Sequence, residues 1–175
     1  MEKYIAFLRG INISRKNKIE MKQLKKCFEE AGFFDVSTYL NSGNVTFSAK
    51  EDNPKCIIEE LIKVECGLDI SVYTIKKDEL DNILENAPSW WGNDDKNLYS
   101  NLIFILSDDT AENLCELIGE TSAELETIQI YQDVIFWTFD RTKYQKCNWW
   151  KRTAADGIAE RLTIRTANTV RKVCK

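Results

Sequence analysis

The sequence has no histidine among its 175 residues. This absence argues against Ser–His and Cys–His catalytic pairs, in which an imidazole activates the nucleophile. It also argues against zinc sites of common spacing, because none of the six cysteines forms a Cys-x-x-Cys pair. We therefore expect no metal and no cofactor. We interpret most of the cysteines as buried free thiols in a reducing compartment.

Proline and glycine are also scarce, with 2 and 7 residues, while 43% of the residues are hydrophobic. This composition favours an ordered chain with a substantial core over a disordered one. The longest apolar runs have the length of strands, and the N-terminus does not resemble a signal peptide, so we expect a cytoplasmic protein without membrane segments. The net charge of −4 argues mildly against bulk binding to nucleic acid or anionic membranes.

In the first half of the chain, segments with the apolar pattern of strands alternate with segments that have the apolar spacing of helices. An apolar strand over Tyr4–Leu8 precedes a helix that starts near Glu20 and stops at Gly32. Two β-prone runs, DVSTYL and NVTFSA, flank the turn sequence NSGN and predict a hairpin. A second helix follows Pro54, and LDISVYTI is a fourth strand. The predicted order is β-α-β-β-α-β.

The second half predicts the same order again, after a connecting helix near 78–87 and a loop around PSWWGNDDKN. Asp109 and Glu112 resemble a capping box at a helix start, and a later helix is predicted near 154–162. We predict an α+β fold of two tandem ferredoxin-like subdomains, with antiparallel sheets and helices on one face. The predicted ranges are 1–76, a connecting segment 77–97, and 98–175; one compact domain is the alternative.

Polar side chains gather at one predicted edge of the first sheet. In this topology the end of strand one lies beside the turn between strands two and three, so RGIN meets NSGN. The cluster is rich in amides and has no acid before Glu20, which suits an anion or a polar planar ligand. The predicted binding residues are Arg9, Gly10, Asn12, Lys18, Asn41, Ser42, Gly43 and Asn44. Alternatively, NSGN is only a tight turn, and Arg9 caps carbonyls or pairs with a nearby Asp. The basic loop SRKNK, from Ser14 to Lys18, is then only a solvated loop.

The motifs YIAFLRGIN, KNKIEM and GFFDVSTYLNSGNVTF, with a weaker match in TIRTANTVRK, resemble a bacterial domain-of-unknown-function family numbered 1697. The resemblance implies a tandem ferredoxin-like fold and no known activity. Where the family often has Gly-Gly this chain has Ser14-Arg15, and where it often has Asn-Trp this chain has Thr166-Ala167. The family pattern adds a second set of predicted ligand-binding residues. These are Arg165, Asn168 and Thr169, hypothesised to face the first cluster across a cleft between the halves.

Three functions are consistent with these features. The favoured interpretation is a site for a small polar or anionic ligand; RNA or single-stranded nucleic-acid binding and a protein-interaction module are the alternatives. The pairs Trp90-Trp91 and Trp149-Trp150 either seal the interface between the halves or stack on bases or sugars. The sequence identifies no general base, so it assigns no reaction, and it does not indicate an oligomeric state.

Overall fold

A computed structural model describes residues 1–175 as an α+β protein with two compact units. The first unit comprises Met1–Asn82 and Val173–Lys175, and the second comprises Ile83–Lys172. Each unit contains a four-stranded sheet. The boundary between the units lies between Asn82 and Ile83, inside the predicted connecting segment 77–97. The last three residues belong to the first unit, whereas the prediction placed them in the second. None of the helices combines the length and the apolar composition of a membrane-spanning segment.

The first unit has the predicted order of elements, and each neighbouring pair of strands is antiparallel. Its sheet order is β2-β3-β1-β4, so the end of β1 lies beside the turn between β2 and β3. The hairpin signal around NSGN is correct, since β2 and β3 are joined by that turn. The elements are β1 (Glu2–Leu8), α1 (Met21–Glu30), β2 (Phe34–Tyr39), β3 (Asn44–Ala49), α2 (Lys55–Cys66) and β4 (Val72–Lys76), followed by α3 (Lys77–Glu85).

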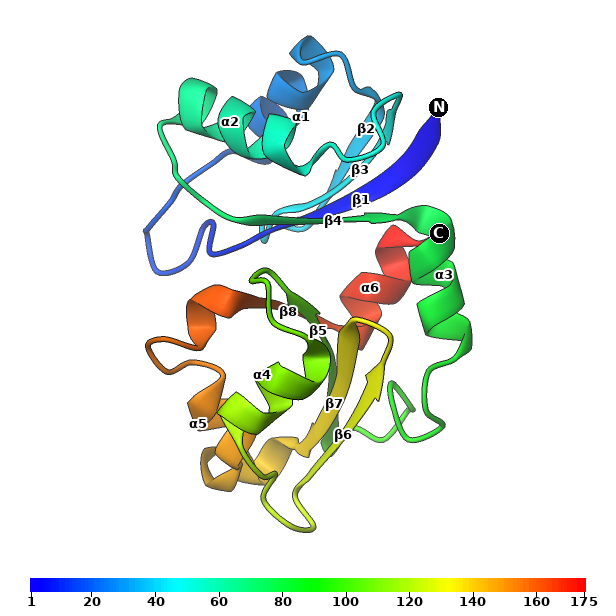
Figure 1. Ribbon diagram of the computed structural model, residues 1–175, viewed down its shortest axis with the longest axis vertical. Coiled ribbons are helices and arrows are strands. Elements are labelled where there is room, and N and C mark those ends of the chain that lie inside the picture. The colour runs from blue at the N-terminus through cyan, green and yellow to red at the C-terminus, as the bar shows by residue number, and fades with distance from the viewer. The chain divides into compact units, whose positions relative to one another are not determined.

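Strand alternation decides which side chains of the first sheet enter the helix-covered core. Tyr4, Ala6 and Leu8 share one face of β1 and belong to a hydrophobic cluster with Phe28 of α1 and Ile58 of α2. Both helices lie on the same side of this sheet (Figure 1). Gly67 ends α2 with a φ of 66°, a conformation that glycine adopts at little cost. The other face of the sheet carries Ile5 and Phe7 of β1, which are also buried, and Thr46 and Ser48 of β3.

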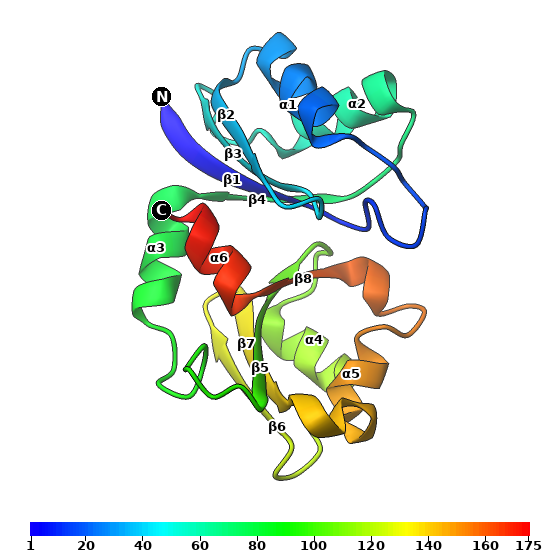
Figure 2. The same ribbon diagram turned by 180° about the vertical axis from the view of Figure 1, so that it is seen from behind.

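The second unit repeats the arrangement, with the sheet order β6-β7-β5-β8 and antiparallel neighbours. The helices α4 and α5 lie on the same side of this sheet (Figure 2). The elements are β5 (Leu98–Ile105), α4 (Ala111–Ile118), β6 (Glu126–Tyr131), β7 (Val134–Asp140), the 3-10 helix η1 (Arg141–Lys146), α5 (Asn148–Arg152), η2 (Ala159–Arg161), β8 (Leu162–Thr166) and α6 (Ala167–Val173).

The helix predicted near 154–162 is wrong. In its place the chain forms α5, which ends at Arg152, then turns, and only three residues of η2. Gly157 lies in the turn with a φ of 82°. This backbone conformation interrupts a right-handed helix. Ile158 enters the core from the turn, and Leu162 enters it from the start of β8.

The capping box predicted for α4 is also wrong. Thr110 is the N-cap, and its side-chain oxygen accepts from the backbone N–H of Asn113 at 3.1 Å. Asp109 is instead the partner of the Ser107 hydroxyl at 2.6 Å and of Arg161 at 2.8 Å. The hydrogen bond from Ser107 is the larger cause, and the one from Arg161 the smaller, of a pKa of Asp109 below its usual value.

The cysteines are all free thiols, but they are less uniformly buried than expected. Cys27, Cys147 and Cys174 are buried, whereas Cys56 is exposed. Burial raises the pKa of Cys147 to about 11 and is the main cause of a rise to about 12 at Cys174. These buried thiols are therefore uncharged at neutral pH and unsuited to nucleophilic chemistry.

Each Trp pair has one buried and one more accessible member. Trp91 packs edge-on against Phe136, with ring centroids 5.0 Å apart, and its indole N–H donates to the Asn101 carbonyl at 2.6 Å. Trp149 is fully buried in the core of the second unit, whereas Trp150 is 42% exposed. Trp91 and Trp149 therefore stabilise the second unit internally, and Trp150 remains accessible to a ligand.

Two buried tryptophans should respond differently to the same substitution. The Nε1 of Trp149 donates to the Gly119 carbonyl at 2.8 Å, whereas the Nε1 of buried Trp137 has no hydrogen-bond partner. Trp137→Phe removes a donor that has no partner, while Trp149→Phe removes the hydrogen bond to Gly119. We therefore expect Trp149→Phe to lower the free energy of unfolding by about 1–3 kcal/mol more than Trp137→Phe does. Urea unfolding of both variants checks this, and equal losses would contradict it.

Candidate functional site

Asn12 is the residue that joins the two predicted loops. Its side-chain amide donates to the Asn41 carbonyl at 2.8 Å and to the Ile19 carbonyl at 2.9 Å. Its Oδ1 accepts from the backbone N–H of Ile19, also at 2.9 Å. RGIN and NSGN therefore meet at one edge of the first sheet. The side-chain amide of Asn12 uses its hydrogen bonds to join these two loops, so Asn12 has a structural role.

The NSGN turn is built for a close approach to β1. The backbone N–H of Leu8 donates to the Gly43 carbonyl at 2.8 Å. A Cβ at Gly43 would lie only 2.7 Å from the Cβ of Leu8. Asn44 is fully buried and donates to the Tyr39 carbonyl at 2.9 Å and to the Ser42 hydroxyl at 3.0 Å. These residues hold the turn together, as the alternative interpretation of NSGN expected.

An open groove of about 850 Å³ lies beside this junction. Its basic lining residues are Arg15 and Lys18 from the loop and Lys22 from the first turn of α1, with Glu20 as the one acid. None of these three cations forms an ion pair. The predicted residues that line the groove are Asn12, Lys18 and Asn41, while Arg9, Gly10, Ser42, Gly43 and Asn44 do not.

Sequence reasoning missed Arg15 and Lys22 as groove residues. For Arg15 the signal was the basic run SRKNK, of which only Lys18 was predicted to bind the ligand, with a solvated loop as the alternative. Lys22 lies outside this run. Ser14 and Arg15 both have positive φ, 46° and 69°, and Asn12 and Asn17 flank them with values of 54° and 48°. Glycine adopts this region far more readily than other residues. The chain therefore holds an arginine at the groove in an unfavourable backbone conformation.

The start of α1 adds to the positive character of the groove. Glu20 occupies the N-cap position but makes no side-chain capping bond, and the first turn contains no acidic residue. The exposed backbone N–H groups of a helix start carry a partial positive charge. The groove therefore combines three side-chain cations with a helix start of the same sign.

The second predicted cluster lies in the second unit. Arg165 donates to the Thr163 hydroxyl at 2.8 Å, and burial lowers the pKa of its guanidinium to about 10, so it stays charged at neutral pH. Thr169 is buried and hydrogen-bonds the side chain of Thr166 at 3.1 Å. Asn168 is exposed and lines a polar cavity of about 360 Å³ with Thr166 and Ala167. That the two clusters form one site stays a prediction.

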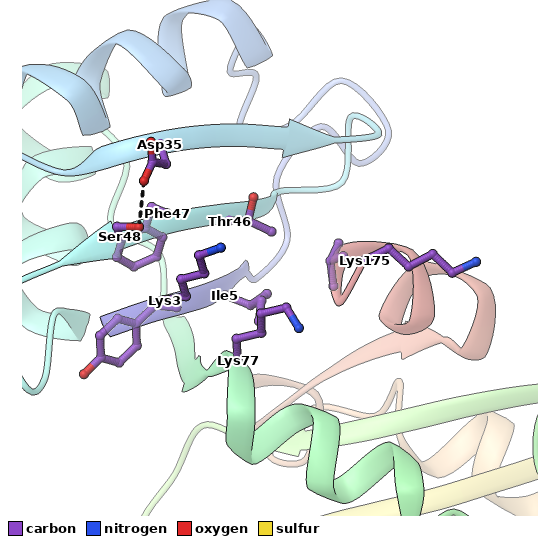
Figure 3. Close-up of a pocket in the computed structure, with 10 residues that line it drawn as sticks. Lys3, Ile5, Asp35, Thr46, Phe47, Ser48, Lys77 and Lys175 are labelled. Carbon is purple, nitrogen blue, oxygen red and sulfur yellow. Dashed lines mark hydrogen bonds between the residues drawn. The ribbon is translucent and has the colours of Figure 1, made fainter. Parts of the chain in front are cut away.

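A smaller cavity of about 170 Å³ lies on the face of the first sheet opposite α1 and α2. Figure 3 shows Lys3 and Ile5 of β1 beside Thr46 and Ser48 of β3, with the Ser48 hydroxyl bonded to Asp35 at 3.1 Å. Lys77 also lines it but is held by Asp81 at 2.6 Å. Because Asp35 offsets one of the lysines and Lys77 is paired, this cavity is less cationic than the groove.

The comparisons with known proteins agree with this architecture. A family described as "Protein of unknown function (DUF1697)" matches residues 1–136. The chain belongs to the DUF1697 family. A solved structure, "The structure of conserved bacterial protein SP0830 from Streptococcus pneumoniae", is similar to this DUF1697 protein with a TM-score of 0.85 and 24% identity. The match covers 99% of this chain and 97% of that one, which shows a shared fold.

No curated protein matches the DUF1697 chain. The family description assigns no function, so the resemblance identified from the sequence is correct and no activity follows from it.

Proposed function

We propose that this DUF1697 protein binds a small anionic ligand, carrying a phosphate or a carboxylate, in the groove beside the RGIN and NSGN loops. The observation that carries the proposal is the set of three cations, Arg15, Lys18 and Lys22, that line one groove without an ion pair. Guanidinium and ammonium groups left without partners in a concave surface are suited to oxyanions.

The local charge supports an anion more strongly than the overall charge would suggest. The protein as a whole carries −4, yet the groove has three cations against Glu20 alone. Unpaired positive charge in a cleft raises the local concentration of anions even when the net charge is negative. The start of α1 contributes in the same direction. Asn12 and Asn41 line the groove and fix the position of the basic loop relative to it.

A thermal-shift titration tests the proposal with inorganic phosphate, glycerol 3-phosphate and citrate as probes. A ligand that binds only the folded protein stabilises it by about 2.7 kcal/mol at a hundred times its Kd. We expect a saturable rise in Tm for at least one probe, and a Kd raised about fivefold or more in Lys18→Gln, which loses one charge-assisted contact.

Lys16→Gln is the matched control. Lys16 is exposed on the same loop, two residues from Lys18, and does not line the groove. Both variants lose one positive charge, so a general electrostatic effect weakens binding equally in the two. Binding lost in Lys18→Gln and kept in Lys16→Gln supports the groove. Equal loss in both, or no saturable shift for any probe, contradicts the proposal.

We also propose that each unit is a ferredoxin-like domain, so that the protein is a tandem duplication of that fold. The order β-α-β-β-α-β in each unit and the matching sheet orders, β2-β3-β1-β4 and β6-β7-β5-β8, support this assignment. The proposed ligand site would then belong to the first repeat, at the loop edge where β1 ends. We further propose that the protein is cytoplasmic, and we assign no reaction to it.

A further inference from the structure

The segment from Arg141 to Arg152 differs from the rest of this acidic protein. It contains no Asp or Glu, and its tyrosine and two tryptophans alternate with basic residues. The basic residues are Arg141, Lys143, Lys146, Lys151 and Arg152. Alternation of cations with aromatic rings is the composition of surfaces that bind nucleotides, because phosphates pair with the cations and bases stack on the rings.

The structure assembles these rings into a connected array. Tyr144 and Trp150 meet edge to face with centroids 4.9 Å apart, and Trp150 contacts Phe139 at 5.5 Å. Phe139 in turn contacts Tyr99 of β5 at 5.4 Å. Phe139 is buried, whereas Tyr144 and Trp150 are 37% and 42% exposed. A rigid strand therefore supports two accessible rings, which border a cavity of about 340 Å³.

Arg141 stands at the junction between this aromatic cavity and the polar cavity that contains Asn168. Both cavities are lined by Arg141 and Tyr99. The guanidinium lies 5.6 Å from the centroid of the Tyr99 ring and forms no ion pair. Its backbone is fixed, since the Arg141 N–H donates to the Asn97 carbonyl at 2.7 Å. An unpaired cation is thus held where an apolar cavity and a polar cavity meet.

We infer that this junction is a nucleotide site. The base stacks on the exposed ring of Trp150, with Tyr144, whose ring is inclined at 71° to that of Trp150, bordering the same cavity. The phosphate binds Arg141, with Lys96 of the polar cavity nearby. The site lies within the second unit, and it does not depend on the anion groove proposed for the first.

Two carboxylates of the polar cavity restrict the ligand to a low charge. Asp94 and Asp95 line this cavity and balance the charges of Arg141 and Lys96. They repel a di- or triphosphate chain, but a carboxylate accepts hydrogen bonds from ribose hydroxyls. The site therefore suits a nucleoside monophosphate. The same chemistry occurs in a free mononucleotide and in one nucleotide of a single strand.

Isothermal titration of the full-length protein with AMP, adenosine, inorganic phosphate and hexa-adenylate tests the inference. AMP should bind more tightly than adenosine or phosphate, since it uses both cavities. Arg141→Gln and Trp150→Ala should each weaken AMP binding about tenfold or more. Trp150→Phe keeps a ring and should retain most of the affinity. Hexa-adenylate that binds more tightly than AMP, with the same dependence on Arg141, identifies a single strand as the source.

Lys143→Gln is the matched control for Arg141→Gln. Lys143 is exposed on the same 3-10 helix, pairs with Asp140 at 3.7 Å and lines neither cavity. Its substitution should leave AMP affinity within about twofold, since exposed ion pairs contribute little. Arg141→Gln should weaken AMP binding by the same factor in the Lys18→Gln background as in the unmodified protein, which separates this site from the groove. The inference is overturned if neither adenylate binds, or if Lys143→Gln and Arg141→Gln weaken binding equally.

Discussion

Gly43→Ala should lower the free energy of unfolding by roughly 2–5 kcal/mol, the sum of a left-handed backbone cost and of overpacking. Gly43 has a φ of 77°. A Cβ there would lie 2.7 Å from the Cβ of Leu8 and 2.9 Å from Cδ1 of Ile11, both on buried residues. The contact with Leu8 involves an atom fixed to the backbone of β1, so the turn itself must move.

Gly10→Ala is the control that separates the two causes. Gly10 has a similar φ of 68°, but an added Cβ would meet nothing within 4 Å. It should therefore cost only the backbone contribution, about 1–2 kcal/mol. Urea unfolding of both variants gives the difference directly. Equal losses would contradict the close approach of the NSGN turn to β1.

Asn12→Ala should destabilise the protein by about 2–4 kcal/mol, because three hydrogen bonds of roughly 1 kcal/mol each are lost. Those bonds connect the loop to the Asn41 and Ile19 backbone. A φ of 54° adds to the cost, since asparagine tolerates the left-handed region better than alanine.

Asn12→Gly isolates the hydrogen-bond contribution, because glycine removes the same side chain without the backbone cost. We expect Asn12→Gly to lose less stability than Asn12→Ala, with the difference reported by urea unfolding. Both variants should also weaken ligand binding in the groove, through displacement of the loop that carries Arg15 and Lys18. Full stability in Asn12→Gly would show that the junction contributes little, and would leave Asn12 as a ligand contact.

Local signals explain why the elements of the first unit could be predicted. Helical spacing of apolar residues, Gly67 after α2 and the NSGN turn act over a few neighbouring residues. The same reasoning failed at 154–162, where the apolar spacing resembles a helix but Gly157 adopts a φ of 82°. It also chose Asp109 over Thr110 as the α4 cap, because both are good capping residues. The structure has Thr110 as the cap and Asp109 as the partner of Ser107 and Arg161.

The candidate sites show a different division. Topology alone predicts that RGIN and NSGN meet, since the strand order places the end of β1 beside the β2–β3 turn. Topology does not predict that the side-chain amides of Asn12 and Asn44 donate hydrogen bonds to backbone carbonyls. It also does not predict that Arg15 and Lys22 line the groove. Amide side chains bind backbone and ligand equally well, so composition does not distinguish the two roles.

The sequence by itself determined the α+β class, the order of strands and helices, the family, and the absence of imidazole chemistry, because each depends on composition or on short-range pattern. Only the tertiary structure decided which polar groups are used internally and which remain available. It alone brought Tyr99, Phe139, Arg141 and Trp150 together, from two strands and two helices. Side chains distant in sequence become neighbours through packing of the whole unit, and no local periodicity encodes that proximity.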